Sequence, residues 1–188
     1  IKHINSAGEV IGERRIIGLY TSAAYNTNPN HIPFLRHKVA QVMRNSDLNI
    51  RSHKSKVLLN IVETLPRDDL IQMSENELLD MAMGIFSMQE RRQIRLFARE
   101  DIYKRFVSCL VYVPREQFNS SLREAMQNVL VHAFDSPKIT YTTWFSESVL
   151  ARINFVVRLT PEQANKIWDF KALESELIEV GRSWTDYF

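Results

Sequence analysis

The residues best equipped for chemistry in this sequence are arginines placed around an apolar run. The stretch RLFAREDIYKRFVSCLVYVPRE, residues 95–116, carries arginines before, within and after a segment apolar enough to be a central strand. Such arginines either hold an anionic ligand or cover the faces and ends of ordinary strands with solvated charge. Arg95 and Arg99 alternate with apolar residues, so we expect both on the outer, solvated face of one strand. Arg105 and Arg115 bracket the next strand, and we expect them at its solvated ends.

One corner of the chain combines an arginine with small polar residues. Arg115 follows the apolar strand, and Asn119, Ser120 and Ser121 stand where the next helix should begin. Free backbone amides at a helix N-terminus favour a negatively charged group. The sequence therefore indicates a candidate anion or effector corner, suited to a carboxylate, at these four residues.

Other kinds of active site find no support in the spacing of residues. The single cysteine, Cys109, lies in the most apolar run, which indicates inert packing and a reducing, cytoplasmic setting rather than a disulfide scaffold. The five histidines lack metal-ligand spacing, and no Gly-x-Ser-x-Gly elbow is present. No glycine lies between Val113 and Leu122, where a dinucleotide-binding loop would need them. We expect no catalytic, metal-binding or cofactor-binding residue in this chain.

Composition places the chain among ordinary globular proteins. It has 188 residues, of which 45% are hydrophobic and 24% charged, with 24 basic and 22 acidic side chains giving a net charge of +2. So small a basic excess argues against a domain that depends on phosphate contacts. No run approaches about 18 apolar residues, so a membrane span is not expected.

The first half of the chain predicts a β-hairpin followed by helices. Residues 1–19 indicate two short strands around a Ser-Ala-Gly turn, the second running through Val10, Ile16 and Leu19. Helical spacing of apolar residues then predicts a helix from Pro33, a second that stops before Pro66, and a third that opens at Ser74. Glu77, three residues after Ser74, completes a capping box, and the acid pair at 68–69 is typical of a helix start.

The second half predicts alternating strands and helices. Strands are expected over 91–99, 105–113, 138–145 and 149–159, and the run at 105–113 is apolar on both faces, as in a covered central strand. A helix with a capping box of Ser121 and Glu124 follows 105–113, and an amphipathic helix closes the chain. From residue 105 the order β-α-β-β-α is ferredoxin-like without its last strand, which would lie beyond Phe188 or come from elsewhere. The fold class is α+β, in two units, residues 1–90 and 91–188.

RNA binding on such a sheet is the alternative function. The segments RFVSCLVY and ARINFVVRL are loosely similar to the two strand motifs of the RNA-recognition fold. Arg152 and Arg158 on one strand face favour it. The low net charge, the absence of a Lys/Arg-Gly-Phe run and Asn154 in place of a glycine–aromatic context count against it.

Several longer stretches resemble a known family, the very large bacterial NAD-dependent glutamate dehydrogenases. They cover nearly the whole chain: GEVIGERRIIGLYTSAAY, IPFLRHKVAQVM, VETLPRDDLIQMS, ERRQIRLFAREDIYKRFVSCLVYVPREQFNSSLRE, SESVLARINFVVR and RSWTDYF. Two places depart from the family pattern, Ile102-Tyr103-Lys104 in place of Pro-Phe-Gly, and Phe118 with Ser120 in place of Tyr and Thr. They leave only the conformation of the turn open.

The resemblance implies a place in a larger enzyme. It assigns the chain to the N-terminal, non-catalytic region, with a PAC-like helical first unit and an ACT-like second unit. The whole enzyme would oxidatively deaminate L-glutamate with NAD, using catalytic residues downstream of a fragment that begins at Ile1. Two roles stay open: assembly with the rest of the chain and other subunits of a homo-oligomer, and sensing of an amino-acid effector. An open sheet edge favours assembly.

Overall fold

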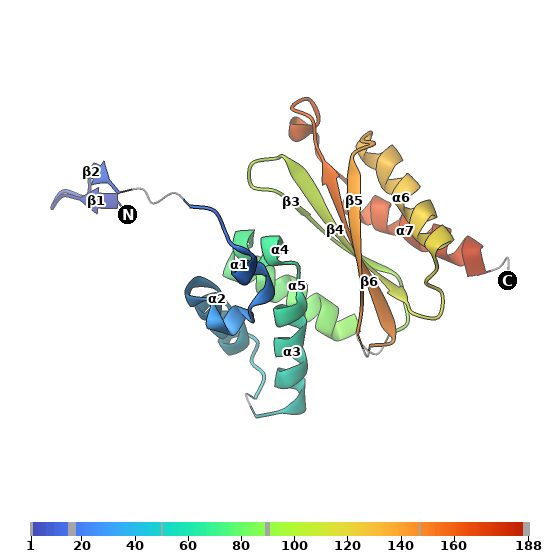
Figure 1. The fold of residues 1–188 in the computed structure, drawn as a ribbon, viewed down its shortest axis with the longest axis horizontal. Coiled ribbons are helices and arrows are strands. Elements are labelled where there is room, and N and C mark those ends of the chain that lie inside the picture. Colours follow the sequence, from blue (N-terminus) through green and yellow to red (C-terminus); the bar gives the residue numbers. More distant parts are fainter. Residues whose placement is uncertain (1, 15–17, 50, 89–90, 147, 186–188) are drawn as a thin grey trace.

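The computed structural model describes residues 2–14, 18–49, 51–88, 91–146 and 148–185. Its N-terminal hairpin pairs β1 (Lys2–Ile4) with β2 (Val10–Glu13) and lies apart from the other elements (Figure 1). Gly8 has a φ of 81°, a conformation that the turn requires and that glycine adopts without strain. The predicted hairpin is confirmed, but its second strand ends at Glu13. Leu19 is 98% exposed outside any strand, and Ile16 lies outside the described residues.

Helices make up the next part of the chain, residues 22–88, which we call the helical unit. Its elements are α1 (Ser22–Asn26), the 3₁₀ turn η1 (Pro29–His31), α2 (Pro33–Asn45), α3 (His53–Thr64), α4 (Arg67–Gln72) and α5 (Glu75–Met88). Three helices agree with the sequence prediction, including the start of α2 at Pro33. The predicted capping box before α5 is confirmed: Ser74 N donates to Glu77 Oε2 at 2.7 Å, and Glu77 N donates to Ser74 Oγ at 3.3 Å.

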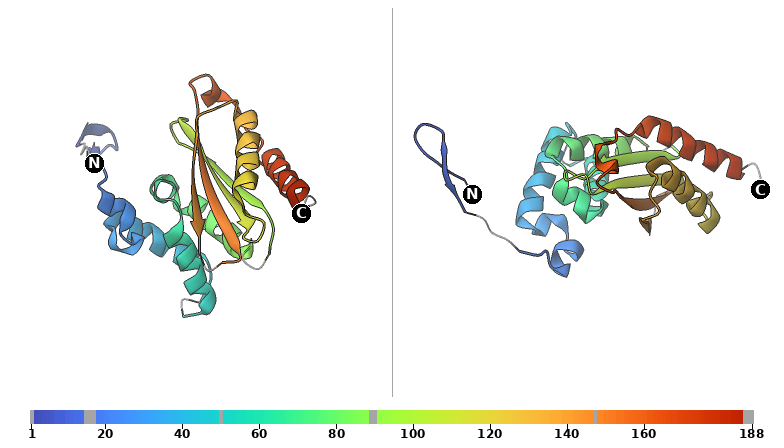
Figure 2. Two further views of the ribbon diagram at one scale, coloured as in Figure 1. Left: turned by 45° about the vertical axis from the view of Figure 1, so that its right-hand side comes forward. Right: turned by 90° about the horizontal axis from the view of Figure 1, so that it is seen from above.

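A four-stranded antiparallel sheet follows, in the order β3-β4-β6-β5. Its elements, with the helices between them, are β3 (Arg95–Glu100), β4 (Phe106–Pro114), α6 (Ser120–Phe134), β5 (Ile139–Phe145), β6 (Leu150–Arg158), the 3₁₀ turn η2 (Gln163–Asn165) and α7 (Phe170–Thr185). α6 and α7 lie on one side of the sheet and the helical unit on the other (Figures 1 and 2). This arrangement is α+β with an ACT-like second part, as expected.

The strand β3 occupies the edge next to β4. In a ferredoxin-like sheet the last strand pairs antiparallel with the first at that edge. Here β4 corresponds to the first strand, and β3, which precedes it in the chain, pairs antiparallel with it from Arg95↔Tyr112 to Glu100↔Val107. Of the two origins considered for the missing strand, the structure thus shows one from elsewhere in the chain.

Both faces of β4 are covered, which explains why its sequence is apolar at nearly every position, Ser108 being the polar exception. Val107, Cys109, Val111 and Val113 pack toward α6 and α7, with Leu122, Met126 and Leu130 of α6 fully buried. From the opposite face Leu110 and Tyr112 join the core of the helical unit, together with Leu150 of β6. The two cores therefore share one sheet as their common wall.

The start of α6 differs from the sequence prediction. Asn119 is the N-cap, and its Oδ1 accepts a hydrogen bond from the backbone amide of Leu122 at 2.8 Å. Ser121 already lies inside the helix, so the predicted capping box of Ser121 and Glu124 is wrong. Asn is among the strongest N-cap residues, and it precedes two serines that are also good caps, so the sequence left the exact start ambiguous.

Candidate functional site

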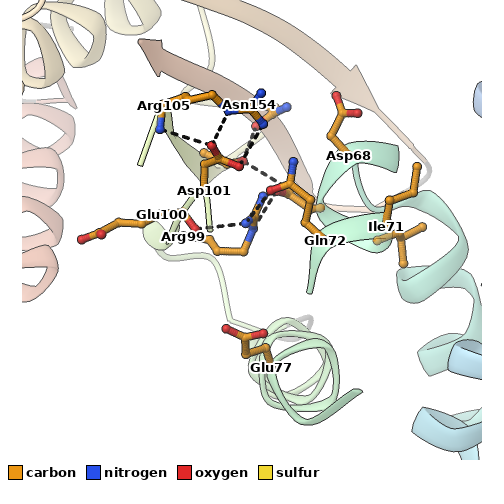
Figure 3. A network of polar contacts seen from close by, with 12 residues as sticks. Asp68, Ile71, Gln72, Glu77, Arg99, Glu100, Asp101, Arg105 and Asn154 are labelled. Carbon is orange, nitrogen blue, oxygen red and sulfur yellow. Dashed lines mark hydrogen bonds and ion pairs between the residues drawn. The ribbon is translucent and has the colours of Figure 1, made fainter. Parts of the chain in front are cut away.

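A buried ion pair joins the helical unit to the sheet. Nη2 and Nε of Arg99, on β3, donate to Oδ1 of Asp69, on α4, at 2.7 and 3.0 Å. Only 9% and 3% of the two side chains are exposed. Nη1 of Arg99 also donates to Oε1 of Gln72 at 3.1 Å (Figure 3). Burying a charged side chain costs free energy unless the charge is paired and hydrogen-bonded. Arg99 and Asp69 therefore have to stay together, and this pair fixes where α4 meets the sheet.

The position of Arg99 contradicts the sequence prediction of a solvated arginine face. Arg99 lies opposite Ser108 of β4 on the side of the sheet that the helical unit covers. Phe97, two residues earlier on the same side, packs against the core of the helical unit. This apolar neighbour was the signal that the face is covered. Arg95, at the start of β3, is about half exposed, and its Nε lies 3.4 Å from Oε2 of Glu174 on α7.

Polar groups of β4 and β6 extend this buried cluster. The hydroxyl of Ser108 donates to Oδ2 of Asp69 at 2.9 Å and lies 3.3 Å from Oδ1 of Asn154. Both carboxylate oxygens of Asp69 therefore have partners from the sheet. Because the contacts of Asp69 and Gln72 cross from α4 to the sheet, sliding one against the other would leave buried polar groups unpaired.

The helix α4 is held from its other end by a lysine. Nζ of Lys38, on α2, donates to the backbone carbonyls of Leu70 at 2.9 Å and Ile71 at 3.1 Å, and also to that of Met73. These are the unpaired carbonyls of the C-terminus of α4, where a cation is favoured. Burial is the main influence on Lys38 and lowers its pKa. Charged side chains thus fix both the first and the last turn of α4, and of these the sequence analysis did not single out Lys38.

A pocket of about 360 Å³ lies beside this cluster, between α4 and the adjacent ends of β4 and β6. Asp68 and Gln72 of α4 line one side, and Arg105 and Arg158 line the side of the sheet. Ser108 and Asn154 also contribute to its wall. The pocket therefore presents carboxylate, guanidinium, amide and hydroxyl groups, which suit a small polar ligand.

Arg105 is positioned by the turn between β3 and β4. Its Nε donates to Oδ2 of the buried Asp101 at 2.8 Å, and its backbone amide donates to the same oxygen at 3.2 Å. Lys104, with a φ of 57°, closes the turn. Burial raises the pKa of Asp101, but the hydrogen bonds and charge of Arg105 outweigh it, so the pKa lies below its ordinary value. A carboxylate thus holds one guanidinium of the pocket in place.

Two residues of the predicted anion corner, Arg115 and Asn119, form hydrogen bonds within the protein. Nη1 of Arg115 donates to the carbonyl of Ser146, in the connection between β5 and β6, at 2.9 Å. Asn119 caps α6, and Ser120 and Ser121 are exposed in its first turn. The corner stays a prediction, which the effect of Arg115→Ala on ligand affinity would test.

Nucleophilic and metal chemistry find little to use among the described residues. Cys109 is fully buried in β4, and burial raises its thiol pKa far above the ordinary value, which leaves it inert. Within the described ranges no three His, Cys, Asp or Glu side chains are grouped so that they could hold a metal ion. None of the described helices is long and apolar enough to cross a membrane.

Family models match both parts of the chain. Residues 32–91 match glutamate dehydrogenase helical motif 1, and residues 95–185 match the glutamate dehydrogenase ACT2 domain. The buried ion pair joins the two matched regions, because Asp69 belongs to the first and Arg99 to the second. Fold and matches together define the class: a helical motif followed by an ACT-type domain.

Curated relatives are similar over almost the whole chain. The chain is 42% identical over 186 residues to an NAD-specific glutamate dehydrogenase of Halomonas elongata and 44% identical over 186 residues to one of Pseudomonas aeruginosa. It is 32% identical over 195 aligned residues to one of Mycobacterium tuberculosis. The matches cover 99%, 99% and 95% of this chain, in the same order, but only 12%, 11% and 12% of the length of the relatives. The chain belongs to the family of the large NAD-specific glutamate dehydrogenases, as a segment of their N-terminal region.

Proposed function

We propose that this chain is a non-catalytic scaffold and regulatory segment of an NAD-dependent glutamate dehydrogenase. The parent protein would convert L-glutamate, NAD⁺ and water to 2-oxoglutarate, ammonium, NADH and a proton. The names of the relatives support this activity for the parent protein. Because this chain matches only about a tenth of their length, we infer a non-catalytic role for the segment. We further propose that the parent is a cytoplasmic homo-oligomer whose other domains and subunits are the partners of this chain.

The buried pair of Arg99 and Asp69 is the observation that carries the scaffold role. It fastens the helical motif to the ACT-type sheet through partly and fully buried contacts. A unit with fixed internal geometry can transmit a change of position between the parts of a large enzyme. The sheet thereby serves as the common wall of two cores.

NAD does not fit the one strand-to-helix corner that precedes α6. Dinucleotide sites use a glycine-rich turn that lets the pyrophosphate approach the backbone. Residues 114–121 contain no glycine, and the N-terminus of α6 is capped by Asn119. We propose that another part of the parent protein binds NAD.

The alternative of RNA binding is less well supported. RNA-recognition sheets expose a face on which bases stack on aromatic rings. In this chain Tyr112 and Phe97 form an edge-to-face pair at 5.9 Å between ring centroids, under the helical unit. The central part of that face is therefore not open to bases.

The test is an assay of NADH formation from L-glutamate and NAD by the intact parent protein, unmodified and with Arg115→Gln. Arg115 is exposed, so this variant should fold. We expect glutamate-dependent NADH formation with an unchanged kcat in the variant. Absence of the reaction would contradict the parent activity, and a folded Arg115→Gln protein without turnover would contradict the non-catalytic role.

A further inference from the structure

The free edge of β5 lacks the features that usually protect the edge of a sheet. β5 pairs with β6 on one side, and no described strand lies on its other side. Edge strands commonly avoid unwanted pairing through charged side chains, proline or a bulge. The segment ITYTTWF has no charged residue and no proline, and its register with β6 is continuous. By contrast β3, at the opposite edge, carries Arg95, Arg99 and Glu100.

Both faces of β5 are open as well. Every residue from Thr140 to Phe145 is exposed, including the rings of Tyr141, Trp144 and Phe145. Among the described residues, the core beneath the helical unit takes apolar side chains from β3, β4 and β6 but none from β5. Aromatic and β-branched side chains are stabilised in strands by contacts with neighbouring strands. β5 therefore has the composition of a strand that is paired on both sides.

The pairing with β6 determines which backbone groups of β5 point to the free edge. The amide of Arg158 donates to the carbonyl of Lys138 at 3.1 Å, which identifies a hydrogen-bonded pair of the ladder. Such pairs alternate along antiparallel strands. The even-numbered residues of 140–144 therefore bond to β6, and the four odd-numbered residues of 139–145 direct their N–H and C=O groups outward. No hydrogen bond from a described residue reaches these outward groups.

We propose that β5 pairs antiparallel with β5 of a second copy of this chain, about a two-fold axis at Thr142. This register places Ile139 opposite Phe145 and Tyr141 opposite Thr143, so all four outward residues of each strand form hydrogen-bonded pairs. Moving the axis to Tyr141 or Thr143 would leave one outward residue of each strand without a partner. The contact is isologous, since both copies use the same strand, and it joins the two sheets into one.

The side chains of β5 are complementary to themselves in this register. On the face toward α6, the two pairs just named each join an aromatic ring to a β-branched side chain, a favourable combination. On the other face Trp144 meets Thr140 of the second copy, and Thr142 meets its own counterpart. Lys138, just before the strand, lies opposite the uncharged Ser146 of the second copy, so no like charges are opposed. Hydrogen bonding, side-chain pairing and charge thus all indicate a second copy as the partner.

The inference deepens the assembly part of the proposed function and rests on the parent being a homo-oligomer. Disulfide cross-linking of the intact parent protein tests the register. Two residues at the axis form a non-hydrogen-bonded pair with Cα atoms about 4.5 Å apart, a separation that a disulfide can bridge. Thr142→Cys should therefore link two chains covalently on mild oxidation. The parent protein without this substitution gives the baseline, to which the buried Cys109 should not contribute.

Thr140→Cys is the matched control, an exposed threonine on the same face of the same strand. In the proposed register its two copies lie four residues apart along the strands, about 14 Å, which is too far for a disulfide. We expect the linked pair of chains from Thr142→Cys and its absence from Thr140→Cys.

A proline at the free edge tests the hydrogen bonds themselves. The N–H of Thr143 points outward, so Thr143→Pro removes no bond to β6, and proline is tolerated at such edge positions. The cross-link should be lost in Thr142→Cys/Thr143→Pro and kept in Thr142→Cys/Thr143→Val, which retains the N–H. Circular dichroism checks that both variants are folded. Hydrogen exchange of the β5 peptide should be slow in the unmodified parent and fast with Thr143→Pro.

Four results would overturn the proposal. They are no cross-link from Thr142→Cys, an equal cross-link from Thr140→Cys, a cross-link that survives Thr143→Pro, and slow exchange of β5 without any cross-link. The last would mean that a different strand covers this edge. None of these results depends on NADH formation, so failure of the pairing is distinguishable from failure of the proposed dehydrogenase function.

Discussion

Replacing Asp69 by asparagine should loosen the contact between α4 and the sheet. The variant keeps the size of the side chain but leaves the guanidinium of Arg99, 9% exposed, without a counter-charge. Breaking a buried pair by removing one partner costs about 3–5 kcal/mol. Since asparagine retains an oxygen that can accept from Arg99, we expect the lower end, about 3 kcal/mol, which corresponds to a roughly hundredfold change in an equilibrium.

Native-state hydrogen exchange of the intact protein is the suitable assay, because a large multidomain protein does not unfold in one step. Peptides over α4 (Arg67–Gln72) and β3 (Arg95–Glu100) should exchange about 100-fold faster in the Asp69→Asn variant. The control is Arg92→Gln, which removes an exposed pair with Glu116 at 3.0 Å. Exposed pairs contribute about 0–1 kcal/mol, so its effect should be at most about fivefold.

An Asp69→Asn variant that exchanges no faster than Arg92→Gln would refute the reasoning. A second measurement separates the pair from its surroundings. The double variant Asp69→Leu/Arg99→Met removes both charges, and apolar replacement of a buried pair is often neutral or stabilising. We therefore expect it to exchange more slowly than Asp69→Asn, and additive single effects would contradict the coupling.

Further predictions concern the caps, the turn and the buried thiol. Lys38→Met should cost about 1–3 kcal/mol, because three carbonyls at the end of α4 lose their donor; unchanged exchange of α4 would contradict this. Asn119→Ala should cost about 1 kcal/mol of α6 stability and Ser121→Ala much less, and the opposite order in thermal unfolding would restore the Ser121 cap. Asp101 has a lowered pKa, so its contribution is complete above its unfolded pKa and lost as pH falls below about 4 through the folded value; Asp101→Asn should flatten that acid limb of a stability–pH curve. Cys109 should resist alkylation in the native protein, and rapid labelling of the peptide over 106–114 would show that β4 opens.

Long periodic segments were predictable from the sequence because local patterns determine them. The helices α2, α3 and α5 and the strands β4 and β6 show apolar spacing over many residues. The helices α1 and α4 have only 5 and 6 residues, too few to display a helical period, and neither was predicted as a separate helix, although the acid pair at 68–69 was interpreted as a helix start. Short helices of this kind are stabilised by tertiary contacts, such as those of Lys38 to the carbonyls of α4.

Non-local pairings were beyond the sequence patterns. The strand β3 was predicted, but nothing in its alternation shows that it fills the edge beside β4. Arg99 was expected in solvent, since an arginine in a strand is usually exposed and its partner Asp69 lies 30 residues away. The candidate pocket depends on the same docking, because Asp68 and Arg158 come together only when α4 lies on the sheet.

We propose that this segment helps to hold its parent enzyme together without taking part in the chemistry. The most direct test measures the turnover per folded molecule of the intact Arg99→Met protein, at saturating L-glutamate and NAD, together with its native mass. We expect faster thermal inactivation or a shifted native mass, with turnover of the assembled molecules essentially unchanged. A fully assembled, equally stable variant that has lost its turnover would contradict the claim.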